Sequence, residues 1–429
     1  MREKYNGNFK TMYLNFKFKN LLLICLIYFG IGLQNQYKSQ ETNQFKTGAD
    51  QPELYLPLLQ NKKVGVVTNQ TGLILKKVKH QVLVTKNGCE IGIKIDTIST
   101  VDFLLDNHID VKRVFAPEHG FRGDADAGEH VKNGIDTKTG LPIISLYGNN
   151  KKPTPSQIKD LDVIVFDIQD VGVRFYTYIS TLAYVMESAA EQGVEVIVLD
   201  RPNPHDGYTD GPVMKSRWTS FVGLHPVPVI YGLTIGEYGN MVNGEGWLKN
   251  GVKANYTVIP MHNYHKTKRY PLLKRPSPNL PNEKSINLYP SLCFFEGTEV
   301  SVGRGTDLPF QIYGSPWTKK MDYKFVPEPN FGAKNPLFNG EVCYGENLKN
   351  YPEDLRQLNL EWIIKAYQNY KNSRKPFFIK NLWFDKLAGT DQLRYQILNG
   401  ASEDEIRKSW QKDLQNFERI RQKYIMYED

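Results

Sequence analysis

The residues best suited to chemistry lie in one stretch, 114–123, which begins as an apolar run and then carries a carboxylate, an imidazole and a guanidinium. The apolar half is typical of the end of a buried parallel strand, and Pro117 stops that strand because it lacks a ladder donor. Glu118, His119 and Arg122 would then lie at a strand's carboxyl end, where ligands bind in open α/β sheets because helices cover both faces. Glu118 is therefore the first candidate catalytic residue, although a structural salt-bridge loop would use the same residue types.

The elements that must position this stretch are short β-branched runs that alternate with helical patterns. Strands are expected at 64–68, 112–116, 143–147, 163–168, 195–199 and 227–231, and helices near 98–106, 178–192 and 234–248. This alternation predicts an α/β fold with a doubly wound parallel sheet and right-handed crossovers. Polar loops follow four strand ends, and on one edge of the sheet they would form a crevice. Turn and capping chemistry would also explain many of their residues.

Composition and charge describe a folded globular protein with a near-neutral body. The 429 residues are 40% hydrophobic, and this length suits two or three domains at roughly 100 to 200 residues each. The net charge is +8, but residues 1–40 hold six Lys or Arg against one Glu, which leaves only +3 for the rest. A protein that binds nucleic acid normally presents a concentrated basic face, so no nucleic acid partner is expected.

The N-terminal region has the pattern of a secretory signal peptide. Residues 21–33 form an uninterrupted apolar run after Lys17 and Lys19, and this run is shorter than the roughly 20 residues that span a bilayer. Met12 would give a short basic segment directly before the run, and Cys25 lacks the small residue usual before a lipidated cysteine. We therefore expect export across the inner membrane to the periplasm or the exterior without a stable membrane span, with lipoprotein anchoring as the alternative.

Several familiar cofactor and nucleophile motifs are absent from the sequence. There is no GxGxxG after the first strand, no GxxxxGK[ST], no GxSxG and no HExxH. Beyond Cys25, three cysteines without CxxC spacing (Cys89, Cys293 and Cys343) and scattered histidines indicate no disulfide framework and no metal site, and no cofactor is expected. Carboxylates at strand ends remain: Glu118, Asp167, Asp170 and Asp200. Two of them would suit glycoside hydrolysis, which uses a protonated acid and an ionised partner about 5 to 9.5 Å apart.

The second half of the chain differs from the first in composition and in its pattern of apolar residues, which indicates a second domain. From about residue 272 the chain becomes Pro-rich, and its last part has a helical pattern. Residues 296–306 place three glycines among charged and hydroxyl groups, including Arg304, which suits close backbone approach to a ligand. A tight turn would use the same glycines. We predict a signal peptide and the start of a linker over 1–40, a catalytic domain over 48–285 and a C-terminal domain over 286–429.

Six strings resemble the signature blocks of the exo-β-N-acetylmuramidases, a family formerly catalogued as a domain of unknown function. They are FAPEHGFRGDADAGE (115–129), TGLPIISLYG (139–148), VIVFDIQDVGVRFYTYISTL (163–182), VLDRPNP (198–204), PSPNLP (276–281) and EGTEVSVGRGTDLPFQIYGSP (296–316). The resemblance implies a secreted enzyme that removes N-acetylmuramic acid from the non-reducing end of peptidoglycan chains. It also implies a Rossmann-like domain joined to a smaller C-terminal α+β domain, with the active site at their interface. One departure is Tyr231, where the family commonly has His.

On this resemblance Glu118 is expected to act as general acid and Asp170 as the second carboxylate, with Asp167 orienting the loop. The substrate's own acetamido group is the alternative to an enzymatic nucleophile. Arg122 or Arg174 is expected to bind the lactyl carboxylate of the sugar, because a guanidinium can form two hydrogen bonds to a carboxylate. The candidate substrate-binding residues are His119, Arg122, Asp167, Arg174, Tyr176, Asn203, Asn279 and Arg304.

Exo-action requires a closed end to the cleft. Phe121, Tyr176 and Tyr178 are expected near the −1 subsite, with the PSPNLP segment beyond them as a stiff stop, because proline fixes φ at little further entropic cost on binding. Two other hypotheses stay open. One is a non-catalytic muropeptide-binding module that has kept the fold, and the other is a different secreted α/β hydrolase, such as an esterase that uses Ser180 or Ser277.

Overall fold

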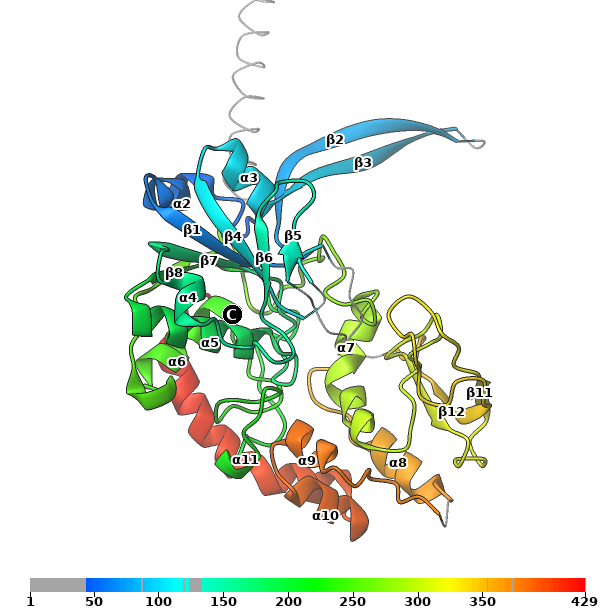
Figure 1. Cartoon of the computed structure of the whole chain (residues 1–429). Coiled ribbons are helices and arrows are strands. Elements are labelled where there is room, and N and C mark those ends of the chain that lie inside the picture. Colours follow the sequence, from blue (N-terminus) through cyan, green and yellow to red (C-terminus); the bar gives the residue numbers. More distant parts are fainter. Residues whose placement is uncertain are drawn as a thin grey trace, which may run out of the picture. The chain divides into compact units, whose positions relative to one another are not determined.

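A seven-stranded sheet is the framework of the N-terminal half (Figure 1). The computed structural model describes residues 44–85, 88–118, 120–122, 133–352, 354–371 and 374–428, with the backbone alone for 77–95. The strand order is β5-β6-β4-β1-β7-β8-β9, and every neighbouring pair is parallel except β5 and β6. This confirms the predicted α/β fold. The strands are β1 (Lys63–Thr68), β4 (Asp110–Ala116), β5 (Gly134–Ile135), β6 (Pro142–Ser145), β7 (Val163–Asp167), β8 (Glu195–Leu199) and β9 (Tyr256–Ile259).

Alternate side chains of the central strands enter two separate hydrophobic cores, as the pleat of a strand requires. Along β7, Val163 and Val165 belong to one core, and Ile164 and Phe166 belong to the other. Helices cover both faces, which explains why the strands are apolar throughout. The first core contains side chains of α2 (Pro52–Leu59) and α3 (Thr100–Asp106), and the second contains side chains of α4 (Pro155–Ile158), α5 (Tyr178–Gln192) and α6 (Ile235–Gly244).

The predicted strand at 227–231 is wrong. Its residues are buried as expected, but Pro226 and Pro228 remove backbone donors, and the segment makes only isolated bridges, from Ile230 to Val173 and to Asp210. The edge of the sheet is formed by β9 instead. A further antiparallel pair, β2 (Leu73–Thr85) and β3 (Gly88–Ser99), was not expected from the sequence.

The C-terminal half combines helices with a small antiparallel sheet, as expected for an α+β part (Figure 1). The sheet order is β10-β12-β11, and the short helix η3 directly follows α7. No helix in the described ranges is long and apolar enough to cross a membrane, and the predicted signal peptide lies outside those ranges. The elements are α7 (Glu283–Leu292), η3 (Cys293–Gly297), β10 (Ile312–Ser315), β11 (Tyr323–Phe325), β12 (Cys343–Asn347), α8 (Glu361–Asn369), α9 (Trp383–Ala388), α10 (Gln392–Leu398) and α11 (Glu403–Arg421).

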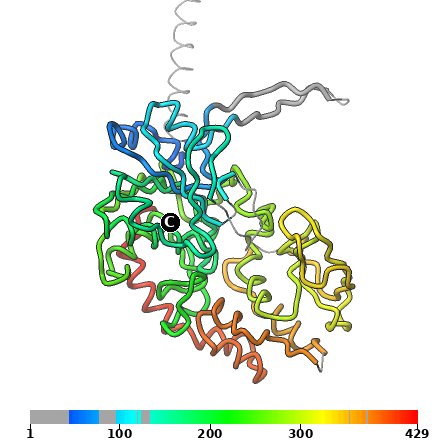
Figure 2. Tube along the Cα trace, viewed as in Figure 1, coloured from blue at the N-terminus to red at the C-terminus, as the bar shows by residue number. Residues whose placement is uncertain are grey.

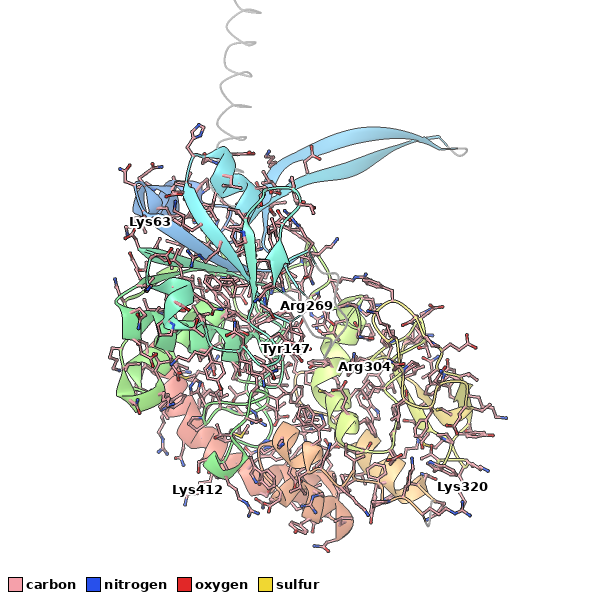
Figure 3. All side chains as sticks on the ribbon, viewed as in Figure 1. Lys63, Tyr147, Arg269, Arg304, Lys320 and Lys412 are labelled. Carbon is pink, nitrogen blue, oxygen red and sulfur yellow. The ribbon has the colours of Figure 1, made fainter. Side chains whose placement is uncertain are left out.

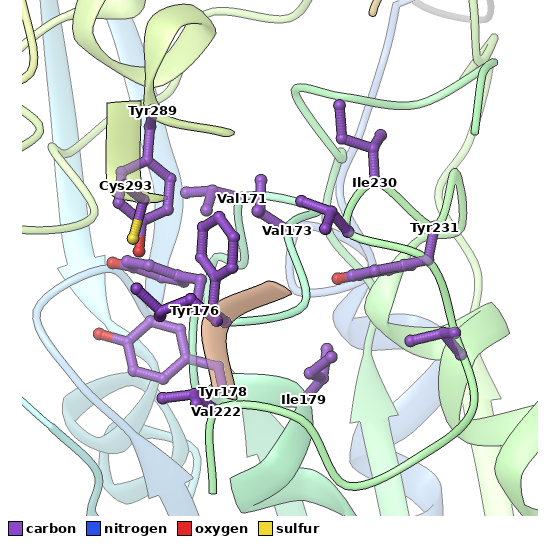
Figure 4. Packing of buried hydrophobic residues seen from close by; sticks show 14 of the residues in the cluster. Val171, Val173, Tyr176, Tyr178, Ile179, Val222, Ile230, Tyr231, Tyr289 and Cys293 are labelled. Carbon is purple, nitrogen blue, oxygen red and sulfur yellow. The ribbon is translucent and has the colours of Figure 1, made fainter. Parts of the chain in front are cut away.

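Residues 47–429 form one compact unit because the two halves share a hydrophobic core. Phe175 packs edge-on against Tyr289 and Phe294, with ring centroids 5.5 and 5.8 Å apart, and Figure 4 shows Tyr289 beside Tyr176 in this cluster. The chain also returns at its end: α11, red in Figure 2, leads back to the sheet half, where the Arg421 guanidinium donates to a backbone carbonyl. The predicted domain boundary near residue 285 stays a prediction.

Arg174 is the buried link between segments that are distant in the sequence. Its guanidinium donates to the carbonyl oxygens of Pro212 and Val227 at 2.8 Å and of Leu387 at 2.7 Å. The side chain is fully buried, and burial lowers its pKa to about 9, so it remains a cation near neutral pH. Because Leu387 belongs to α9, Arg174 ties the C-terminal half to the sheet half. Its predicted role in binding a substrate carboxylate is therefore wrong.

Replacing Arg174 should destabilise the fold. Arg174→Ala removes a donor from three buried carbonyl oxygens. Val227 keeps the backbone N–H of Met214 at 3.0 Å, but Pro212 and Leu387 lose the donor that Arg174 supplies, and each unsatisfied group costs about 1 to 3 kcal/mol. We expect the free energy of unfolding, measured by urea denaturation, to fall by about 3 kcal/mol or more. The matched control is Arg217→Ala, which removes an arginine whose side chain is 77% exposed and should change stability by less than about 0.5 kcal/mol. Equal stability of the two variants would contradict the linking role.

Candidate active site

A cavity of about 1000 Å³ lies where the two halves meet. The sheet half contributes loops at the carboxyl ends of its strands, including Glu118 after β4, Tyr147 after β6 and Thr177 before α5. The C-terminal half contributes Glu296 and Arg304. Figure 3 shows Tyr147 and Arg304 on elements of the two different halves. The cavity thus brings together two carboxylates from opposite walls.

Glu118 is held by two hydroxyl groups. The Tyr147 hydroxyl donates to Oε1 at 3.1 Å, and the Thr177 hydroxyl donates to Oε2 at 3.0 Å. Thr177 is the N-cap residue of α5, so the positive end of that helix dipole points toward the carboxyl group. Burial and then the nearby charge of Glu118 raise the pKa of Tyr147 well above its ordinary value, so this phenol keeps its proton. Glu296 and Arg304 also act on the same phenol, which shows that both carboxylates are close to it.

Glu296 is paired with Arg304. Nε and Nη2 of Arg304 both donate to Oε1 of Glu296, at 3.0 and 2.6 Å. The guanidinium also lies over the Phe310 ring, 5.1 Å from its centroid. Burial lowers the pKa of Arg304, but the charge of Glu296 outweighs this effect and raises it above the ordinary value. The pair therefore keeps a cation next to Oε1 of Glu296, while the Cys293 thiol lies 3.8 Å from Oε2 and donates to it.

Sequence reasoning singled out the segment that carries Glu296 but not this carboxylate. The segment was noted for its glycines and for Arg304, which does line the cavity. Glu296 could have been found by asking which acid would balance Arg304, because a partly buried arginine usually has a carboxylate partner. The pairing also means that the Arg304 guanidinium is already occupied.

Asp170 does not reach the cavity. The carboxyl group is buried, and it accepts hydrogen bonds from the Tyr231 hydroxyl and, at 2.7 Å, from the backbone N–H of Gly172. Tyr231 thus binds Asp170 in the interior. Burial raises the pKa of Asp170 to about 6. The second carboxylate of the cavity is therefore Glu296 in place of the predicted Asp170.

Asp167 and Arg122 are engaged in ion pairs away from the cavity lining. Asp167 is buried and accepts two hydrogen bonds from the Arg201 guanidinium, at 2.5 and 2.9 Å, so it is not placed to bind substrate, and its orienting role stays a prediction. Arg122 donates to both oxygens of Asp136, at 3.1 and 2.7 Å. Arg122, like Arg174, is thus not positioned to bind a substrate carboxylate.

The other predicted binding residues fall into three groups. Tyr176 lines the cavity, and its hydroxyl donates at 2.8 Å to the carbonyl of Pro276, in the Pro-rich segment. Asn203 and Asn279 are buried, and their side-chain amides donate to the backbone carbonyls of Leu233 and Gly332, at 2.9 and 2.6 Å. The third group is His119, which lies outside the described residues.

Nothing in the described part of the chain favours a metal centre or a serine esterase. No group of three or more His, Cys, Asp or Glu side chains there is arranged to hold a metal ion. Ser180 is buried in α5, away from the lining. Ser277 lines the cavity, but its hydroxyl accepts a hydrogen bond from the backbone of Asn279, and the described lining contains no histidine to activate it.

Two carboxylates, Glu118 and Glu296, line one cavity at the strand ends of a parallel α/β sheet, and a pair of carboxyl groups in one cavity is typical of one class of enzyme, the glycosidases. The sequence matches the family description "Exo-beta-N-acetylmuramidase NamZ, N-terminal" over residues 64–284 and its C-terminal counterpart over residues 287–427. The chain belongs to this exo-β-N-acetylmuramidase family of glycosidases, which confirms the resemblance seen in the sequence.

Known proteins agree with this assignment along most of the chain. The protein "Peptidoglycan beta-N-acetylmuramidase NamZ" from Bacillus subtilis is 38% identical over 394 residues, which cover 87% of this chain and 89% of that protein. Two crystal structures of DUF1343 family proteins from Bacteroides fragilis are also similar. One has 40% identity and a TM-score of 0.77, covering 90% of this chain and 99% of its own. The other has 29% identity and a TM-score of 0.71, covering 90% and 100%.

The buried carboxyl group of Asp170 should make stability depend on pH. Its pKa of about 6 in the folded state exceeds the value near 4 of an unfolded chain, so the folded state binds the proton more tightly. The resulting stabilisation is complete below about pH 4 and is lost as the pH rises through 6. Asp170→Asn removes this titration. The wild type loses this stabilisation between pH 4 and 8, and the variant does not. The free energy of unfolding of Asp170→Asn minus that of the wild type should therefore increase by up to about 3 kcal/mol from pH 4 to pH 8.

Denaturant titrations at pH 4 and pH 8 measure this difference. The exposed Asp322 provides a control, because Asp322→Asn should change stability equally at both pH values. A difference between Asp170→Asn and the wild type that is the same at pH 4 and pH 8 would show that Asp170 titrates normally.

Proposed function

We propose that this chain is a secreted exo-β-N-acetylmuramidase that removes N-acetylmuramic acid from the non-reducing end of peptidoglycan fragments during cell-wall turnover and recycling. The observation that carries the proposal is the pair of carboxylates, Glu118 and Glu296, which come from the two halves of the chain and line one cavity. Family membership supports the reaction, and the name of the Bacillus subtilis relative supports the polymer. The apolar run 21–33 after basic residues supports export to the periplasm or the exterior.

Glu118 is the general acid in this proposal. It gives its proton to the glycosidic oxygen as the bond to the sugar breaks, which glycosidases require because a sugar alkoxide is a poor leaving group. Tyr147 and Thr177 contact it through hydroxyl groups, which can either donate or accept a hydrogen bond. The same geometry can therefore hold the acid before proton transfer and the carboxylate after it.

Glu296 is the ionised partner. The Arg304 guanidinium stabilises the negative charge through two hydrogen bonds to Oε1. An ionised carboxylate on the wall opposite the acid can stabilise the positive charge that develops at the anomeric carbon, and it can assist the attacking water or acetamido group. Glu296 thus has a cation beside it, and Glu118 has two hydroxyl groups among its partners, a difference in surroundings that supports separate roles for the two carboxyl groups.

The walls of the cavity favour exo-action. The Pro-rich segment contributes Ser277 and Leu280, and the loop before β12 contributes residues 332–337. Tyr176 holds the Pro-rich segment through its hydrogen bond to Pro276, and Asn279 joins that segment to the loop at Gly332. Two linked segments at one side of the cavity support a blocked end, which a terminal sugar can enter and a continuing chain cannot pass.

Two substrates distinguish the roles of the carboxylates. The disaccharide N-acetylmuramyl-N-acetylglucosamine has a sugar leaving group that needs an acid, whereas 4-nitrophenyl N-acetyl-β-muramide has a leaving group that needs little help. Glu118→Gln should lower kcat/KM about 100-fold or more on the disaccharide and much less on the nitrophenyl glycoside. Glu296→Gln should lower kcat/KM on both substrates. Glu299→Gln, which changes an acid that pairs with Lys375 and is absent from the lining, is the matched control.

An equal loss on both substrates in Glu118→Gln would remove Glu118 as the acid. Full activity of Glu296→Gln on both substrates would remove Glu296 as its ionised partner.

The direction of attack can be measured with two kinds of glycan fragment. Fragments with N-acetylmuramic acid at the non-reducing end should lose that sugar, while fragments that begin with N-acetylglucosamine should remain intact, because the cavity has a blocked end. Mass spectrometry of the products resolves the two cases. Internal cleavage of either fragment would contradict exo-action.

A further inference from the structure

The cavity contains more positive than negative side chains in its described lining. The acids are Glu118 and Glu296, and the cations are Lys151, Arg304, Lys334 and Lys386. Arg304 is paired with Glu296, and Lys334 has a partner of its own. The two remaining lysines have no carboxylate partner within the described residues, so the cavity holds uncompensated positive charge.

The two remaining lysines differ in their surroundings. The Lys151 ammonium lies over the Phe221 ring, 4.9 Å from its centroid, so a cation–π interaction already holds it. The Lys386 side chain is half-buried and has no hydrogen-bond, ion-pair or ring partner in the ranges that the structure describes. A partly buried cation without a counter-ion loses hydration and gains nothing in return. Lys386 is therefore the cation that a bound anion would stabilise most.

Lys386 belongs to a helix face that is turned toward the cavity. Trp383, Lys386 and Leu387 all line it, and their spacing of i, i+3 and i+4 places them on one side of α9. The face thus presents an indole, an ammonium group and an aliphatic side chain, which suits a sugar ring that carries an acid.

The helix is fixed close to Glu296. A Cβ atom added at Gly297 would lie 2.5 Å from the Cα of Phe384, so α9 packs directly on the turn that follows Glu296. The carbonyl of Leu387 is bound by Arg174. Lys386 is therefore presented from a rigid element near the carboxylate pair rather than from a mobile loop.

We propose that Lys386 binds the lactyl carboxylate of N-acetylmuramic acid and so distinguishes this sugar from N-acetylglucosamine. The inference rests on the proposed function. Lys386 takes the role that the sequence suggested for Arg122 or Arg174, which have other partners. The two sugars differ by the lactyl ether on O3, whose carboxylate is the only charge on the free sugar. Lys386 would bind this carboxylate through a charge-assisted hydrogen bond, while Trp383 on the same face contacts the sugar ring.

The test combines a change in the enzyme with a change in the substrate. One substrate is 4-nitrophenyl N-acetyl-β-muramide with its free lactyl carboxylate, and the other carries a carboxamide at that position. The wild type should prefer the carboxylate by about 10- to 150-fold in kcat/KM, the range expected for one hydrogen bond to a charged group. Lys386→Met should lose this preference through slower turnover of the carboxylate substrate alone. Lys386→Arg should keep most of it.

Matched controls separate Lys386 from other lysines. Lys412→Met changes an exposed lysine of α11, which Figure 3 shows away from Arg304, and it should keep the wild-type preference. Lys151→Met should keep most of the preference, because that ammonium is already held by Phe221. Thermal unfolding of each variant verifies that it is folded. If Lys386→Met does not fold, Lys386→Gln replaces it in the test, and an unchanged preference in Lys386→Gln overturns the proposal.

The outcomes also separate this inference from the proposed function. A Lys386→Met variant that keeps the wild-type preference overturns the inference, and so does a loss of preference in Lys151→Met instead. A wild type that cleaves both muramides equally well also overturns it and leaves the proposed function standing. A wild type that cleaves neither muramide contradicts the proposed function itself.

Discussion

The cavity depends on one buried cation that never touches it. Arg174 binds the carbonyls of Pro212 and Val227 in the sheet half and of Leu387 in α9. A buried guanidinium without a carboxylate partner is costly, and it is tolerated only where several acceptors surround it. Gly389 fits the arrangement, because a Cβ there would lie 2.9 Å from Nη2 of Arg174. Arg174 thus adds a buried polar link to the hydrophobic core that the two halves share.

Carboxyl groups that look alike in the sequence have different roles, depending on whether they are buried or accessible. Asp167 is the last residue of β7 and Asp170 follows that strand, but Asp167 pairs with Arg201 and Asp170 accepts a hydrogen bond from Tyr231. Neither lines the cavity. Glu118 and Glu296 remain partly accessible and have contrasting partners, hydroxyl groups for the first and a guanidinium for the second. The structure thus separates acids that stabilise the fold from acids that can meet a substrate.

The sequence predicted what is decided locally. Alternating apolar runs predicted the parallel sheet except at its edge, where β9 lies in place of 227–231, and a strand end followed by polar residues predicted that Glu118 would line a cavity. Prediction from the sequence fails where the role of a side chain depends on a partner that is distant in the sequence. Arg122 and Arg174 have the chemistry to bind a carboxylate, but Asp136 and three carbonyls occupy them. Glu296 and Lys386 enter the site from a distant part of the chain, so only the folded structure brings them to the cavity.

A crystal structure of the Glu118→Gln variant with the disaccharide N-acetylmuramyl-N-acetylglucosamine tests the central claim most directly. The account predicts that the N-acetylmuramic acid ring lies between residue 118 and Glu296, with the glycosidic oxygen within hydrogen-bond distance of residue 118. A disaccharide bound in the cavity with its glycosidic bond away from both residues, or bound elsewhere on the protein, would contradict the account.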